Sequence, residues 1–238
     1  MSPLDVVTSS TGRVLTEPVR HQIVGPVLSL RRPETARLLR RMRRHHVMPA
    51  FSYPWGSEQA YLELLGDVCP LVVLHVPNEV RDGDVESKVR VLSNFGAVIV
   101  LTSGPTDPAR LLLAGAVNVL PHDLSPPELA SRLVAERRWL TLSRSGSDRR
   151  VAWKLRHLPE VQQTSQRVLL HLLSSASRPL CCHDLCLLLG GADTPLRRRA
   201  LQARIRRLDD RLAQHGMSLR RTSEWGRTTF RGIHDRHR

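Results

Sequence analysis

The 238-residue sequence has four cysteines, two lysines and no long hydrophobic run. Its apolar stretches fall well short of the ~18 residues of a membrane span, so we expect no membrane partner. The first residues lack the charged-then-apolar pattern of a signal peptide. Four cysteines are too few for a disulfide framework in a chain of this size, which suits a reducing compartment. These absences predict a cytoplasmic protein.

Motifs for catalysis are missing as well. The sequence contains no nucleophile elbow, phosphate loop, zinc-protease motif or recognisable pair of catalytic carboxylates. We therefore expect neither an enzyme nor a protein that depends on a cofactor.

What the sequence does have is positive charge, concentrated in its second half. Residues 1–147 contain 17 basic and 14 acidic residues, a net of +3, whereas residues 148–238 contain 19 basic and 8 acidic residues, a net of +11. A domain that binds a polyanion requires such an excess. The charge therefore predicts a nucleic-acid partner for the C-terminal half.

A short flexible stretch at 143–148 (SRSGSD) marks the boundary between two domains. The predicted organisation, in chain order, is an N-terminal arm over 1–22, a first domain over 23–142, a linker over 143–150, a second domain over 151–233 and a basic tail over 234–238.

Strands and helices alternate in the first domain. The predicted strands are 24–30, 71–76, 97–102 and 117–120, and the predicted helices are 33–45, 57–66, 84–94, 107–114 and 126–141. The runs at 71–76 (LVVLHV) and 97–102 (AVIVLT) are almost wholly apolar, as strands buried on both faces must be. This pattern predicts a doubly wound parallel α/β sheet of flavodoxin-like type.

The second domain has a different order of elements. Helices are predicted at 164–173, 181–189 and 196–213, followed by β-prone runs at 218–223 and 228–231 that are joined by a turn containing Trp225 and Gly226. Three helices followed by a hairpin predict an α+β winged helix-turn-helix domain.

The third of these helices carries one apolar stripe. Leu201, Ile205, Leu208 and Leu212 recur at helical spacing, which leaves an arginine-rich face opposite. Guanidinium groups suit guanine edges and phosphates in a major groove ~12 Å wide. The candidate DNA-binding residues are Arg199, Gln202, Ala203, Arg204, Arg206, Arg207 and Arg211 on the helix, with Thr222 and Arg227 on the hairpin. Trp225 either contacts DNA or covers a hydrophobic seam.

The stretch 199–212 (RALQARIRRLDDRL), the entry 178–185 (RPLCCHDL) and the hairpin residues 219–222 (LRRT) resemble the OmpR/PhoB-type response regulators. The resemblance implies that Arg199, Arg204 and Arg206 hold phosphates while Arg207 reaches a base. Two features depart from the family pattern. Gly190 stands where tryptophan is usual, and Asp209 and Asp210 replace basic residues.

The first domain resembles the receiver domain of the same family, through 27–33 (VLSLRRP), 71–75 (LVVLH), 98–103 (VIVLTS) and 115–129 (GAVNVLPHDLSPPEL). A receiver holds Mg²⁺ with acidic residues, phosphorylates an aspartate and pairs it with a lysine. At the matching places this chain has Arg31 with Arg32, His75 and His122. Thr102 matches, and Val119 replaces the aromatic switch residue.

Two guanidinium groups cannot hold a hard dication that requires carboxylate oxygens. The resemblance therefore implies a pseudo-receiver without aspartyl-phosphate chemistry. Its matching positions are expected to converge at one sheet edge, where they form either a pocket for a small anionic ligand or part of a purely structural dimerisation domain. The residues of this candidate pocket are Arg31, Arg32, His75, Thr102 and His122.

We expect an atypical response regulator that controls transcription. It should bind promoter or operator double-stranded DNA as a homodimer, paired through segments 107–114 and 126–141, with RNA polymerase as a further candidate partner.

Three alternatives remain open. They are a phosphorylation-dependent regulator that uses Asp67, Asp82 or Asp84, an RNA-binding antiterminator, and a thiol or metal sensor. The sensor would use Cys181, Cys182, His183 and Cys186, although cysteine at such a position commonly packs as a small hydrophobe.

Overall fold

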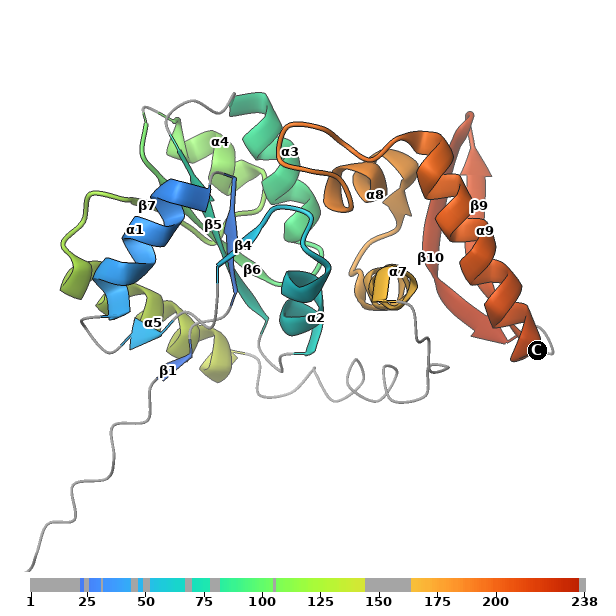
Figure 1. Ribbon diagram of the computed structural model, residues 1–238, viewed down its shortest axis with the longest axis horizontal. Helices are drawn as coiled ribbons and strands as arrows, with labels where there is room; N and C mark the ends of the chain where they lie inside the picture. The colour runs from blue at the N-terminus through green and yellow to red at the C-terminus, as the bar shows by residue number, and fades with distance from the viewer. Residues whose placement is uncertain are drawn as a thin grey trace, which may run out of the picture.

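The structure of the protein is a computed structural model (Figure 1). It describes residues 22–23, 26–30, 32–43, 47–48, 52–66, 70–77, 82–104, 106–143 and 164–235. Residues 1–21 of the expected arm, 144–150 of the expected linker and the following residues to 163 are not among them.

A five-stranded parallel sheet forms the centre of the first part of the chain (Figure 1). Its strands, in spatial order, are β4 (Ser52–Pro54), β2 (Val27–Ser29), β5 (Leu71–Val76), β6 (Ala97–Thr102) and β7 (Asn118–Pro121). Every neighbouring pair is parallel. Numbered along the chain, this is the order 2-1-3-4-5 of flavodoxin-like sheets. The predicted α/β architecture is confirmed.

Helices cover both faces of the sheet, as alternating side chains require. The helices are α1 (Arg32–Arg43), α2 (Glu58–Gly66), α3 (Asp82–Leu92), α4 (Pro108–Leu113) and α5 (Pro126–Ser143). Leu39 of α1 and Leu129 of α5 share one core cluster with Val73 and Ile99. The neighbouring strand residues Leu74 and Val98 belong to the cluster on the opposite face, together with residues of α2, α3 and α4.

The edge strand β4 was not predicted. It is three residues long, contains Pro54 and is only half-buried, so it lacks the continuous apolar run by which β5 and β6 could be recognised. Proline is tolerated there because an edge strand need not donate on its open side. A two-residue pairing of β1 (Gln22–Ile23) with β3 (Val47–Met48) was not predicted either.

The second part of the chain contains three helices and a three-stranded antiparallel sheet in the spatial order β8-β10-β9. In chain order its elements are α7 (Thr164–Ser175), β8 (Leu180–Cys181), α8 (Cys182–Leu188), α9 (Arg198–Gln214), β9 (Met217–Glu224) and β10 (Arg227–Asp235). The three helices and the hairpin lie within a few residues of the predicted ranges. β8 was not predicted, and β10 continues through His234 and Asp235, the first two residues of the expected tail.

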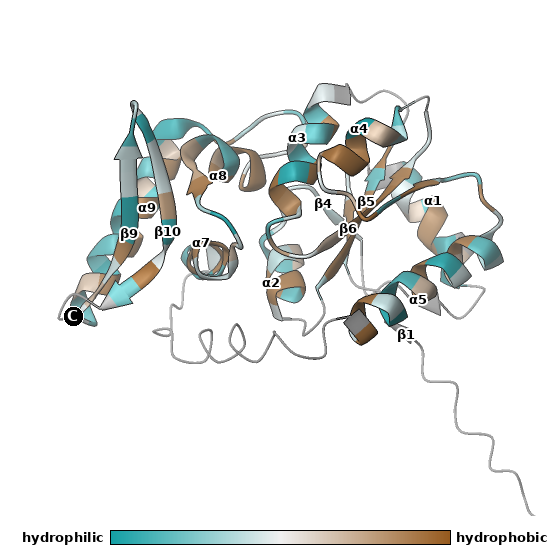
Figure 2. Cartoon of the chain, turned by 180° about the vertical axis from the view of Figure 1, so that it is seen from behind, coloured by the Kyte–Doolittle hydropathy of each residue, from teal (hydrophilic) through white to brown (hydrophobic). Residues whose placement is uncertain are grey.

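The two parts share one hydrophobic core. Helix α2 packs against α7, and α3 packs against α8 (Figure 1). A single cluster of buried residues contains Leu64 and Val85 of the first part and Leu169 and Leu188 of the second. In Figure 2 the hydrophobic colour is concentrated on the central strands and on the helices between the two sheets. No helix in the described ranges combines the length and hydropathy needed to cross a bilayer.

Candidate nucleic-acid interface

Helix α9 is held in place by its predicted apolar stripe. Leu201, Leu208 and Leu212 are completely buried, and Ile205 is 7% exposed. The helix follows Pro195 and is rich in alanine, leucine, arginine and glutamine, which have high helix propensity. Its register is thereby fixed, because any rotation would expose leucine side chains.

The face opposite the stripe is open to solvent. Five predicted contact residues on α9 are exposed: Arg199, Gln202, Ala203, Arg206 and Arg207. Arg206 and Arg207 are adjacent, so they project about 100° apart around the helix axis. The exposed face therefore presents guanidinium groups over more than one direction, which suits simultaneous contact with phosphates and base edges.

Arg204 and Arg211 differ from the other predicted contact residues because both are only half-buried. The Nη1 atom of Arg204 lies 4.0 Å from Oε1 of Glu58 on α2. Arg204 thus faces the first part of the chain, and its charge is partly balanced there.

Asp209 connects α9 to the base of the hairpin. Its Oδ1 atom accepts a hydrogen bond from the backbone N–H of Leu219 over 3.2 Å, and its Oδ2 atom accepts one from Nη2 of Arg221, also over 3.2 Å. This explains the acidic residue at a position where basic ones were expected from the resemblance. Asp210, its neighbour, is exposed.

Strands β9 and β10 meet at a two-residue turn. Glu224 pairs with Arg227, and the intervening Trp225 and Gly226 have φ values of 50° and 72°. Positive φ at both positions is the pattern of a type I′ hairpin turn. For a tryptophan, this backbone costs roughly 1–2 kcal/mol.

All residues from Arg220 to Arg227 are exposed, and Figure 2 shows the hydrophilic colour along β9. This stretch includes the predicted contact residue Thr222. The relative exposure of Trp225 is 103%, so the interpretation that it covers a hydrophobic seam is wrong.

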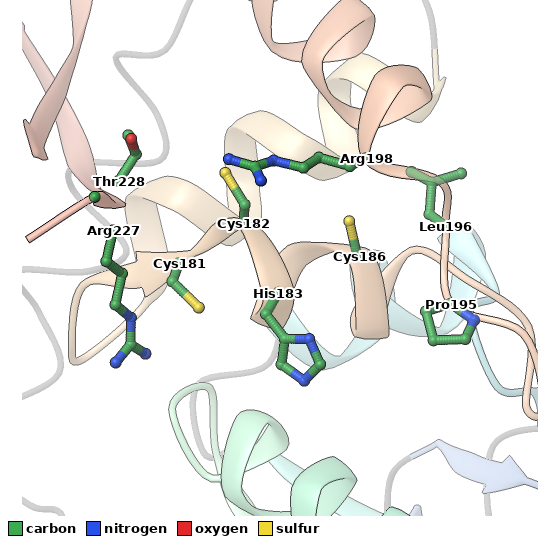
Figure 3. Close-up of a pocket in the computed structure, with 10 residues that line it drawn as sticks. Cys181, Cys182, His183, Cys186, Pro195, Leu196, Arg198, Arg227 and Thr228 are labelled. Carbon is green, nitrogen blue, oxygen red and sulfur yellow. The ribbon is translucent and has the colours of Figure 1, made fainter.

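An open hollow of ≈ 650 Å³ lies where the tip of the hairpin meets the starts of α8 and α9 (Figure 3). Arg198, at the start of α9, and Arg227, after the hairpin turn, both line it. The hollow therefore brings the two basic elements predicted to contact DNA to one end of the molecule.

The cysteine cluster lines the same hollow. Cys181, Cys182 and Cys186 are free thiols, and Cys181 and Cys186 are buried. Burial raises the pKa of the Cys186 thiol, and the neighbouring Cys182 raises it further. In Figure 3 the imidazole of His183 points away from the sulfurs of Cys182 and Cys186. Within the described ranges, no group of three histidine, cysteine or acidic side chains is placed to hold a metal ion.

His75, which the resemblance matched to the phospho-acceptor of a receiver, is buried near the end of β5 with an exposure of 1%. Its Nδ1 atom lies 2.7 Å from Oγ1 of Thr35, which in turn lies 2.6 Å from Oγ of Ser29. Among the residues that the structure describes, none forms a hydrogen bond with Nε2 of His75. Burial lowers the pKa of His75 to about 4, and the proximity of His122 adds to this shift.

The other residues of the expected ligand pocket are placed in part. Thr102 ends β6, and its carbonyl accepts a hydrogen bond from the backbone N–H of His122 over 2.9 Å. The two residues therefore lie at the carboxyl edge of the sheet, where β5 ends with His75 and Val76. Arg31 falls outside the described ranges, and only the backbone of Arg32 is described, as the first residue of α1.

The acidic residues of the phosphorylation alternative are also placed in part. Asp67 is not among the described residues, and Asp82 is described only as the first residue of α3. Asp84 is exposed one helical turn before Lys88, a buried residue whose Nζ lies 5.6 Å from the ring centroid of Trp55. Burial lowers the pKa of Lys88, and Asp84 and Asp193 oppose that shift.

Two exposed residues at this end of the second part were not among the predicted contact residues. Arg198 lines the hollow, and no pattern in the sequence brings it close to the hairpin. Trp225 had two open interpretations, and the structure leaves it fully exposed at the hairpin turn.

No protein-family model matches the sequence, and no curated protein matches it either.

Proposed function

We propose that the chain is a sequence-specific DNA-binding transcription regulator whose residues 164–235 form a winged helix-turn-helix domain. In this proposal α9 is the recognition helix, and β9 with β10 forms the wing. The observation that carries it is the combination on α9 of a fully buried leucine stripe with an exposed, arginine-rich opposite face.

The arrangement of α9 and the hairpin supports this assignment. Both border the hollow that contains Arg198 and Arg227, so one duplex can contact the start of the helix and the wing together. Arg199 and Arg206 are assigned to phosphates, and Arg207 to a base edge. Arg204 contributes less to DNA binding than these, because its guanidinium lies beside Glu58.

The first part of the chain acts as a regulatory domain without aspartyl phosphorylation. A neutral, buried histidine bonded to Thr35 occupies the place of the phospho-acceptor. Control would then come from a small anionic ligand at the carboxyl edge of the sheet, or from dimerisation. Acetyl phosphate with Mg²⁺ should label neither His75 nor a nearby acid such as Asp84. Labelling would favour the phosphorylation-dependent alternative.

A homodimer through α4 and α5 is part of this proposal. Apolar side chains are exposed on α4 and directly after it, with Leu113 at 89% and Val117 at 45%. On α5, Trp139 and Leu142 are exposed by 67% and 74%. Such side chains are suited to burial in an interface between subunits. A two-fold dimer would present two recognition helices to half-sites about one helical turn apart.

The deciding experiment is selection of duplexes from a randomised pool by the full chain at physiological salt, followed by competition with duplex RNA and single-stranded RNA. We expect one enriched DNA motif that RNA does not displace. Failure to enrich any motif would contradict the proposal, and preferential displacement by RNA would favour the antiterminator. Metal analysis and thiol titration of the same preparation address the sensor alternative.

A further inference from the structure

The tip of the hairpin is built around a tryptophan that contributes nothing to packing. Trp225 is fully exposed, and so are all its neighbours from Arg220 to Arg227. A side chain with this exposure gains no burial on folding. Its large apolar ring therefore remains available to a partner.

The backbone conformation at Trp225 is a second reason why folding stability does not explain a tryptophan at this position. Within the described part of the chain it is the sole residue other than glycine with a positive φ. Asparagine, aspartate and glycine are the residues that suit the first position of a type I′ turn. A tryptophan that is both strained and unpacked points to a functional constraint on this position.

The surroundings of Trp225 favour a nucleic acid as that partner. The exposed stretch from 220 to 227 contains three arginines, at 220, 221 and 227, and Glu224 as its single acidic residue. Arg198 shares the hollow beside Gly226. A large exposed aromatic ring on a hairpin with a net positive charge suits a nucleic acid, because bases stack on aromatic rings and phosphates attract arginine.

We propose that Trp225 is a wedge that inserts at a base step beside the sequence contacted by α9, unstacks that step and bends the duplex. Apolar side chains on DNA-binding proteins produce kinks in this way, and the kink brings more of the protein surface into contact. The inference rests on the proposed function. With such a wedge, the affinity for DNA would also depend on how easily one base step deforms, at a step that α9 itself does not contact.

The test uses a duplex selected by the full wild-type chain, with 2-aminopurine placed at successive steps and a dye pair at its ends. Wild-type protein should raise the 2-aminopurine fluorescence at one step and shorten the end-to-end distance. Trp225→Asn should abolish both signals and weaken binding about tenfold, while Trp225→Phe should retain part of each. Trp225→Asn suits the turn, so its melting temperature should equal or exceed that of the wild type.

Arg227→Ala is the matched control on the same turn. It should reduce the slope of log affinity against log salt by about one, because a phosphate contact is lost, whereas Trp225→Asn should leave the slope unchanged. If the Trp225→Asn complex keeps wild-type unstacking and bending, the wedge is overturned while the proposed function stands. If the wild-type chain selects no duplex, the proposed function itself fails.

Discussion

The indole N–H of Trp55 donates a hydrogen bond to the carbonyl oxygen of Leu187 over 2.8 Å, across 132 residues of sequence. Six residues later, on α2, the hydroxyl of Tyr61 donates to the carbonyl of Leu188 over 2.7 Å. The last carbonyls of a helix have no partner within it. At the end of α8, two of them are therefore satisfied by the first part of the chain.

The remaining carbonyls of this turn are satisfied locally, since Leu185 accepts from the N–H of Leu189, and Cys186 accepts from that of Leu196. The segment between α8 and α9 is thus fixed to the first part of the chain at one end and leads into α9 at the other. A change in α2 can therefore reach α9 through a connected set of bonds. Under the proposed function, it would be a physical route by which the first part of the chain controls DNA binding.

The variant Tyr61→Phe removes one oxygen atom and should cost about 1–3 kcal/mol in the free energy of unfolding, because it leaves the buried carbonyl of Leu188 without its donor. Burial raises the pKa of the Tyr61 hydroxyl, so it remains a donor at physiological pH. Urea denaturation followed by circular dichroism measures the loss. Tyr53→Phe is the control: its hydroxyl bonds to Glu63 at a half-buried site, and its loss should be smaller. Equal losses would contradict the capping role.

A second prediction concerns the contact between Gly56 and Gly190. Gly56 has a φ of +79°, and a Cβ atom there would lie 1.9 Å from the carbonyl oxygen of Gly190. Gly56→Ala should therefore destabilise the chain by about 1–3 kcal/mol and separate the unfolding of its two parts. Calorimetry should then show a broadened or split transition.

Gly66→Ala is the control for this contact, because nothing lies within 4 Å of a Cβ atom at that position on α2. It should be neutral or slightly stabilising. If Gly56→Ala unfolds in a single sharp transition at the same melting temperature as Gly66→Ala, the close approach of Gly56 to Gly190 is unimportant for stability.

Gly190 itself was anomalous in the sequence, because it replaces the tryptophan usual in the family that the chain resembles. A Cβ atom at Gly190 would lie 2.5 Å from the backbone nitrogen of Leu196 and 2.6 Å from Cα of Pro195, so a side chain has no room there. The sequence could not predict this, because it depends on how the segment from 190 to 196 folds back on itself. By contrast, β5 and β6 were predictable, since strands buried on both faces need continuous apolar runs.

The candidate site was predictable to a similar degree. Helical periodicity identified Leu201, Ile205, Leu208 and Leu212 as the buried side of α9, and hence its exposed side. It could not place the half-buried Arg204 beside Glu58, nor show that Trp225 is fully exposed, because both depend on elements distant in sequence or on the shape of the hairpin.

The third prediction concerns pH. The pKa of His75 is lowered to about 4 in the folded chain, mainly by burial, against about 6.5 when unfolded. The unfolded chain therefore binds more protons between these values. The contribution of a neutral His75 to the free energy of unfolding is fully present above about pH 6.5 and is lost as the pH falls toward 4. The loss should reach up to about 3 kcal/mol.

His75→Asn removes the titrating group and keeps a polar atom near Thr35. Its free energy of unfolding should depend less on pH between about 4 and 6.5 than that of the wild type, as measured by denaturant titration at several pH values. His183→Asn, which removes an exposed imidazole, is the control and should keep the wild-type slope. An unchanged slope in His75→Asn would mean that the histidine is not the group responsible.

The fourth prediction addresses the dimer. Leu113 is 89% exposed on α4, so Leu113→Glu should leave the monomer folded and should shift the chain toward monomer, because a charge cannot be buried cheaply in an apolar interface. Sedimentation velocity measures the change. Leu142→Glu tests the α5 side in the same way. A wild-type chain that is already monomeric at micromolar concentration would refute the dimer.

Adjacent arginines on α9 should have separable roles in binding DNA. Arg207→Ala should relax specificity at one position of the selected sequence, by about 1–3 kcal/mol. Arg206→Ala should weaken binding to all sequences alike and reduce the salt slope by about one, because a phosphate contact carries no sequence information. Both side chains are exposed, so neither change should affect folding.

Fluorescence anisotropy with the selected duplex, its single-base variants and a scrambled duplex distinguishes these effects. Gln214→Ala, at the last residue of α9, is the control for a change on the same helix far from its start. If both arginine variants lose the same affinity for selected and scrambled DNA, α9 binds only through charge. The sequence specificity would then have to come from another element.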